Sequence, residues 1–270
     1  MTAPGPTSAV PPRHPQGRGR AFSLVELLIV IAIIGLLTAI GLPALRGLGE
    51  SNAIDAATRQ VLDDLAFARQ QAINQRSEVF MIFVPPDLHR YQPETQRRFM
   101  TNLTTQRLTT YALYARRTVG DQPGQPSPRM LTPWRSLPDG VFFAPEWFLV
   151  QRQTNDALWQ FTAQLPRTNL FSVPVYYPPV RSNVVVPGAN LPYIRFTPRG
   201  QLLAFGPRSA PPAHHDVILR LSKGSIFAAN PLEYPDVVET PRGYRRFIRV
   251  NGLTGRARVD HPPGAREIIP

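Results

Sequence analysis

The stretch FSLVELLIVIAIIGLLTAIGL, residues 22–42, is the most informative part of this chain, because it holds 21 residues and only one charge, Glu26. As an α-helix it would extend about 31 Å at 1.5 Å per residue, close to the roughly 30 Å hydrocarbon core of a bilayer. The preceding residues 1–21 are rich in proline and glycine and contain three arginines but no acid. The positive-inside rule predicts that this basic flank stays cytoplasmic and that the rest of the chain is exported.

Three kinds of segment could have this character. A secretory signal peptide has a shorter apolar core, of about 7–15 residues. A plain membrane anchor fits the length but gives no reason for the acid Glu26, since an ionisable group inside a bilayer is costly without a partner. Cleavage between Ala21 and Phe22 would supply that partner, because the new amine of Phe22 is a cation. In an assembly, Glu26 of one subunit can then pair with the Phe22 amine of a neighbour and set the stagger between subunits.

The run RAFSLVELLIVIAIIG, residues 20–35, resembles the N-terminal signal of type IV prepilins and type II secretion pseudopilins. The resemblance implies that prepilin peptidase cuts before Phe22 and N-methylates it. It also implies that Glu26, as the fifth mature residue, serves in assembly, and that Pro43 occupies the position where the family kinks its helix.

The residue before the cut departs from the family pattern, which usually has glycine where this chain has Ala21. The nearest glycine is Gly19, and a cut after it would make Glu26 the seventh mature residue. The interpretation therefore keeps the cut between Ala21 and Phe22, because that cut preserves the spacing of phenylalanine and glutamate.

Residues 44–76 show an amphipathic helical pattern that continues the apolar segment. Its apolar residues recur at spacings of three or four: Ile54, Ala57, Val61, Leu65, Ala68 and Ala72. This stripe predicts a helix half-buried against its own head domain. The stretch LDDLAFARQQAI, residues 62–73, resembles the equivalent stretch of the FimT/GspH group of minor pilins and pseudopilins.

After residue 77 the pattern becomes typical of β-structure, with β-branched and aromatic runs separated by glycine and proline. Strands are expected at 78–84, 107–114, 193–197, 201–205, 216–221, 245–250 and 257–259. Residues 193–202 predict a hairpin with Gly200 in its turn, and both this hairpin and residues 247–259 resemble parts of the GspH-like head. The expected fold class is α+β, with a long N-terminal helix packed on a mainly antiparallel sheet.

The predicted organisation is a leader at 1–21, a transmembrane or filament-core helix at 22–43, the amphipathic half of the helix at 44–76, and a β-rich head at 77–270. Within the head, residues about 86–190 are interpreted as long proline-rich insertions, which the resemblance does not cover.

The residue inventory predicts a protein that is not an enzyme and takes no cofactor. The chain has no cysteine, which excludes disulfides, thiolate catalysis and cysteine-based zinc sites. The run His214-His215-Asp216 is the one candidate for a metal site, but neighbouring residues in a strand point to opposite faces. No phosphate-binding loop or nucleophile elbow occurs, and no metal site is predicted.

The basic C-terminal region is the candidate for DNA binding. The chain has a net charge of +12, almost all of it from arginine, which fits nucleic acid, anionic lipid or plain arginine-rich composition. Arg256 and Arg258 would share one face of a strand and could reach phosphates, with Arg245 and Arg249 nearby. The run GRAR, residues 255–258, resembles the tail motif of DNA-binding FimT-like minor pilins.

The sequence therefore predicts a minor pilin or pseudopilin. The expected partners are prepilin peptidase, other pilin or pseudopilin subunits, the inner membrane and, in the alternative role, DNA. The precursor is expected in the bacterial inner membrane with a single span and a periplasmic head, and in a filament after assembly. A DNA-capturing pilin for natural transformation and an adhesin that uses residues 86–190 stay open as alternatives.

Overall fold

The computed structural model describes residues 23–91, 100–118, 120–122, 127–148, 165–176, 183–203, 216–230, 233–240 and 245–260. At 40–51, 91, 147, 168–170, 174–176 and 183–184 it describes the backbone alone. The chain divides into two compact units, residues 1–48 and 49–270.

Helix α1 (Leu24–Asn74) begins directly after Ser23. In the first unit, all residues from 23 to 39 are exposed, and the large apolar side chains among them are 44–79% exposed. None of the helices, over the residues described, is long and apolar enough to span a bilayer. The predicted span runs from Phe22 to Pro43. Phe22 lies outside the described residues, and only the backbone of Pro43 is described.

In the second unit, α1 buries the apolar stripe that its sequence predicts. The six stripe residues are all at most 1% exposed: Ile54, Ala57, Val61, Leu65, Ala68 and Ala72. Asp63 and Gln70, on the opposite side of the helix, are exposed. The helix ends where Arg76 takes a left-handed conformation (φ 47°) and the Ser77 amide donates to the Ala72 carbonyl at 3.2 Å. The predicted half-burial of this segment is confirmed.

Two antiparallel sheets form the head. The first has the order β3-β2-β1-β7-β6 with β4 paired to β2, and the second has the order β11-β10-β8-β5 with β9 paired to β8. The first sheet contains β1 (Val79–Phe83), β2 (Thr110–Ala115), β3 (Arg129–Met130), β4 (Arg135–Ser136), β6 (Arg167–Tyr176) and β7 (Asn183–Phe196). The second contains β5 (Val141–Phe143), β8 (Val217–Phe227), β9 (Asp236–Glu239), β10 (Arg245–Val250) and β11 (Ala257–Asp260). Over the described residues, short helices lie between strands at η1 (Leu88–Tyr91), α3 (Thr101–Thr104) and η3 (Pro145–Trp147).

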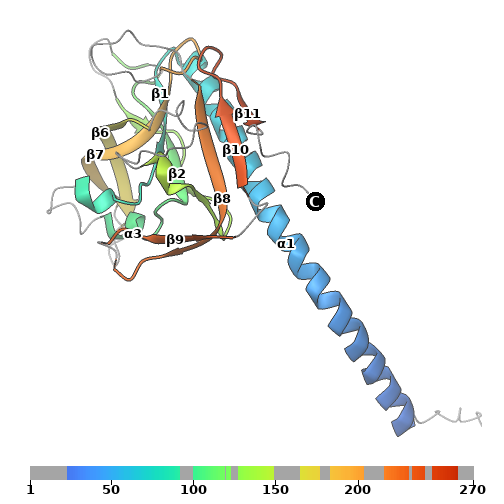
Figure 1. Cartoon of the computed structure of the whole chain (residues 1–270). Coiled ribbons are helices and arrows are strands. Elements are labelled where there is room, and N and C mark those ends of the chain that lie inside the picture. Colours follow the sequence, from blue (N-terminus) through green and yellow to red (C-terminus); the bar gives the residue numbers. More distant parts are fainter. Residues whose placement is uncertain are drawn as a thin grey trace, which may run out of the picture. The chain divides into compact units, whose positions relative to one another are not determined.

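The first hydrophobic core joins α1 to both sheets. The helix stripe packs with Met81 and Phe83 of β1, Leu221 of β8 and Ile248 of β10, all at most 1% exposed. In Figure 1 the cyan part of α1 runs alongside β8 and β10. Together, the helix and the antiparallel sheets confirm the α+β class.

A second core lies on the other face of the first sheet. Here Phe80 of β1 and Tyr114 of β2 pack with Phe171 of β6 and Tyr193 of β7. Ring centroids in this group are 5.1–6.4 Å apart with interplanar angles of 68–80°, an edge-to-face arrangement. Because the central strand β1 has a core on each side, all five of its residues are buried, and its sequence is uniformly apolar.

The proline-containing region 86–190 supplies much of this second core. Strand β6 and the first part of β7 form a long hairpin despite Pro174, Pro187 and Pro192. Register shifts interrupt the pairing between Thr168 and Phe171 and again between Phe171 and Val173. Pro187 lies opposite the second shift, whereas Pro174 and Pro192 face Val185 and Arg167 in register. A proline cannot donate to the ladder, so each removes one possible backbone hydrogen bond. The region interpreted as insertions therefore contains structural strands of the head.

The strands expected at 78–84, 245–250 and 257–259 are confirmed to within a residue at each end. The strand expected from residue 107 begins at Thr110, because Leu108 has a positive φ of 63° and ends a turn. The predicted hairpin at 193–202 is confirmed, since Phe196 bridges to Leu202 and Gly200 in its turn has φ 74°. Of the strand expected at 201–205, only the Leu202 bridge is seen, and residues 204–205 lie outside the described ones.

Candidate functional site

The start of α1 holds the residues predicted for processing and assembly. Ala21 and Phe22 lie outside the described residues. Ser23 caps the helix, because its Oγ accepts a hydrogen bond from the Val25 amide at 3.3 Å and its carbonyl accepts one from the Leu27 amide at 3.1 Å.

Glu26 is exposed in the first turn of this helix. A carboxylate there is stabilised by the positive end of the helix dipole. Ser23 was not predicted as a site residue from the sequence. The spacing Ser23-x-x-Glu26 is the capping-box pattern, and this pattern would have indicated that Ser23 caps the helix. The same turn that would carry the mature N-terminus thus holds both a helix cap and the acid.

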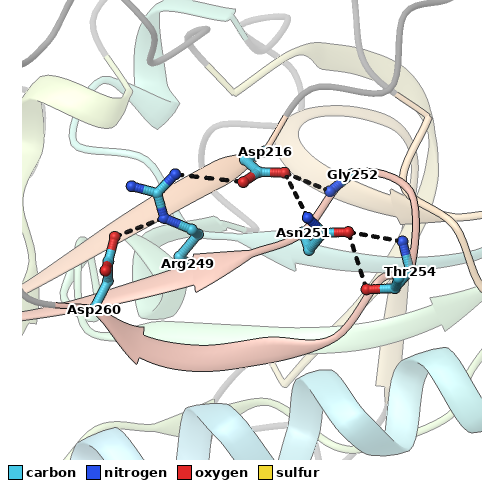
Figure 2. A network of polar contacts seen from close by, with 6 residues as sticks. All are labelled: Asp216, Arg249, Asn251, Gly252, Thr254 and Asp260. Atoms are coloured by element: carbon cyan, nitrogen blue, oxygen red, sulfur yellow. Dashed lines mark hydrogen bonds and ion pairs between the residues drawn. The ribbon is translucent and has the colours of Figure 1, made fainter.

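The C-terminal hairpin β10–β11 holds the four predicted arginines and is braced by a polar network (Figure 2). Asp216 accepts hydrogen bonds from the Gly252 amide at 2.8 Å and from Asn251 Nδ2 at 3.2 Å. Asn251 Oδ1 in turn accepts from the Thr254 amide at 2.9 Å and from Thr254 Oγ1 at 3.0 Å. These bonds hold the turn between the two strands in one conformation.

Arg249 and Arg245 are both neutralised. Arg249 Nε lies 2.6 Å from Asp260 Oδ2, and its Nη1 lies 3.4 Å from Asp216 Oδ2 (Figure 2). The hydrogen bond to Asp260 raises the pKa of Arg249. Arg245 donates to one carboxylate oxygen of Glu239, from Nε at 3.1 Å and from Nη2 at 2.7 Å. Both guanidinium groups therefore have a carboxylate partner in the structure, although Arg245 itself stays exposed.

Arg256 and Arg258 differ from these two. Both are exposed, and over the described part of the chain no carboxylate lies within ion-pair distance of either side chain. Arg258 is directly opposite Arg249 in the antiparallel register, where two like charges repel, so Asp216 and Asp260 offset part of that repulsion. Over the described residues, the four arginines thus divide into two that have carboxylate partners, Arg245 and Arg249, and two that have none, Arg256 and Arg258.

The hairpin turn is locked against two other segments of the head. Gly255, with φ 63°, is so close to the turn at residue 200 that an added Cβ would lie 2.0 Å from the Gly200 carbonyl oxygen. The Leu202 amide donates to the Gly252 carbonyl at 2.9 Å, and Arg69 Nε of α1 donates to the Thr254 carbonyl at 2.7 Å. The three stretches that carry the sequence resemblance in the head therefore meet at one corner.

The suggested metal motif is not assembled among the described residues. His214 and His215 lie outside them, and Asp216 is engaged with Arg249, Asn251 and Gly252. Over the described parts of the chain, no three potential metal ligands lie together.

Comparison with known families gives one match, at the N-terminus. Residues 17–42 match the model described as the prokaryotic N-terminal methylation motif. The chain carries a type IV pilin-like prepilin signal. Such signals are typical of membrane-anchored pilins and imply processing by prepilin peptidase and assembly with other pilins. No curated protein and no solved structure matches this chain.

Proposed function

We propose that this chain is a minor pilin or pseudopilin of the FimT/GspH type, with a structural and not a catalytic role. The precursor is held in the bacterial inner membrane by residues 22–43, with its head on the periplasmic side. Prepilin peptidase removes residues 1–21 and methylates Phe22, and the subunit then joins a type IV pilus or a type II secretion pseudopilus.

The prepilin signal at 17–42 carries this proposal. The apolar surface of α1 supports it, because a helix that is apolar all round needs lipid or other helices around it. Between residues 23 and 39, all the large apolar residues of α1 are exposed: Leu24, Val25, Leu27, Leu28, Ile29, Val30, Ile31, Ile33, Ile34, Leu36 and Leu37. The head supports it too, since among the described residues both of its cores are built from residue 53 onward, whereas residues 23–39 are all exposed.

Mass spectrometry of the protein from its own cells tests the processing step. We expect a mature N-terminus at Phe22 carrying one methyl group. A Glu26→Gln variant is the matched comparison: it should still be cut, but should be depleted from purified filaments, because the Phe22 amine of a neighbour loses its charged partner. An intact Met1 in the wild type, or filaments that take up the Glu26→Gln variant normally, would contradict the proposal.

A second candidate role is DNA capture by the C-terminal hairpin. The observation that favours it is the exposure of Arg256 and Arg258 without an acidic partner, in contrast to Arg245 and Arg249. Phosphate contacts from two such cations would give salt-dependent binding without a requirement for base sequence.

Fluorescence anisotropy with a labelled duplex tests this role on the full chain in detergent. Replacing both Arg256 and Arg258 with alanine should weaken binding and lower the slope of log K against log salt by about 2. The matched control replaces Arg117 and Arg129, which are exposed arginines elsewhere on the head, and removes the same charge. If both double variants lose the same amount of affinity, the effect comes from net charge alone, and the proposed DNA site on the hairpin is wrong.

A further inference from the structure

A pocket of about 520 Å³ lies in the head, away from the helix start and from the β10–β11 hairpin. Its walls come from the turn that follows α3, from β5 and from the far end of β8. Among the residues lining it are Thr104, Arg107, Phe142, Gly224 and Ile226. Of the described residues around it, Arg107 is the sole ionisable side chain.

Arg107 is a buried cation without a described carboxylate partner. It is 4% exposed, and its Nη1 donates to the Pro86 carbonyl at 3.3 Å and to the Glu233 carbonyl. Burial lowers the pKa of this arginine. Carbonyl dipoles compensate a buried charge only in part, so an anion in the pocket would gain more from Arg107 than from a surface arginine.

The pocket also borders an edge of β8 that β5 does not cover. On one edge of β8, Lys223 pairs with Thr240, because the Thr240 amide donates to the Lys223 carbonyl at 2.8 Å. The Gly224 amide points the other way and donates to the Gly140 carbonyl at 2.8 Å. By the alternation of an antiparallel ladder, the amide and carbonyl of Ile226 point to this second edge. There β5 pairs no further than Lys223, whereas β9 pairs with β8 along Ile226 on the first edge.

We propose that this pocket binds an extended peptide segment that carries a carboxylate, with the peptide backbone pairing to the β8 edge at Ile226 and the carboxylate pairing with Arg107. Strand addition supplies backbone hydrogen bonds that do not depend on sequence, and the buried cation supplies selectivity for an acid. This site goes beyond the assembly role proposed above and does not require DNA binding.

Binding of two capped hexapeptides to the full-length protein in detergent micelles tests the proposal. The peptides are acetyl-Val-Thr-Val-Glu-Val-Thr-amide and its glutamine counterpart, each with a fluorescent label. We expect the glutamate peptide to bind at least about tenfold more tightly, because a charge-assisted pair is replaced by a neutral one. Arg107→Gln should abolish this preference, whereas Arg117→Gln, which removes an exposed arginine, should leave it unchanged.

Because Arg107 also holds two carbonyls, Arg107→Gln could unfold the protein, and circular dichroism checks this. Thr105→Glu gives an independent readout, since Thr105 is exposed at the pocket and an acid there should repel the glutamate peptide alone. Sodium acetate should compete with the glutamate peptide but not with the glutamine peptide at equal ionic strength. Equal affinity for both peptides, no effect of Thr105→Glu, or equal competition by acetate against both peptides would overturn the proposal.

Discussion

Tyr111→Phe would remove hydrogen bonds that link α1 to β2. The Tyr111 hydroxyl donates to Asp64 Oδ2 at 2.7 Å and accepts a hydrogen bond from Gln60 Nε2 at 3.0 Å. Asp64 is 3% exposed and also pairs with Arg135. Burial, followed by the bond to Asp64, raises the pKa of Tyr111. A hydrogen bond to a charged group contributes about 1.5–3 kcal/mol, so we expect Tyr111→Phe to lower the free energy of unfolding by about that amount. For a unit of this size, the melting temperature should fall by roughly 3–10 °C.

Thermal and urea unfolding, followed by circular dichroism, measure this loss. The matched control is Tyr114→Phe, which removes a buried hydroxyl from the same strand without touching a carboxylate, and it should cost less than about 1 kcal/mol. A double-mutant cycle with Asp64→Asn should give a coupling energy of about 1 kcal/mol or more. A Tyr111→Phe loss no larger than that of the control, with a coupling near zero, would refute the role of this bond.

Two further predictions concern the head. Gly255→Ala should lower the free energy of unfolding by about 2–4 kcal/mol, because alanine is strained in a left-handed conformation and its Cβ would clash with the Gly200 carbonyl oxygen. The control is Gly120→Ala, which is also at positive φ but has no described atom within 4 Å of the added Cβ. It should lower the free energy of unfolding by less in the same urea titration. Burial raises the pKa values of Tyr114 and Tyr193, so their contribution to stability should be present below about pH 10 and lost above it. Replacing both with phenylalanine should reduce, but not remove, the loss of stability in unfolding curves measured from pH 8 to 12, because the pKa of Tyr111 is raised as well.

Much of the fold could be predicted where neighbouring residues carry the pattern. The stripe from Ile54 to Ala72 repeats at helical spacing, and the same six residues are buried against the head. The run 78–84 is apolar throughout, which fits its place between two cores. The turn at Gly200 needs a left-handed residue, and glycine supplies it. In each case, a local preference agrees with the tertiary structure.

The second core could not be predicted in this way. Proline in β6 and β7 indicates a break in regular structure, and the long pairing of these strands overrides that local preference. Phe80 and Phe171 are far apart in sequence, yet their rings stack edge-to-face at 5.3 Å. The sequence around Phe80 does not indicate that Phe80 will contact Phe171, and the sequence around Phe171 does not indicate it either. The contact forms only because the two strands are buried against each other.

The candidate sites show the same division. Contiguous residues determined the prepilin signal, the Glu26 spacing and the presence of a basic C-terminal hairpin, because each of these is a property of one short stretch. Which arginines have carboxylate partners depends on the tertiary structure. Arg249 contacts Asp260 and Asp216, which are 11 and 33 residues away in sequence. Arg107 lines a pocket that has no acidic residue among its described lining residues. Ion pairs depend on distances in space, and those distances exist only once the sheets have packed.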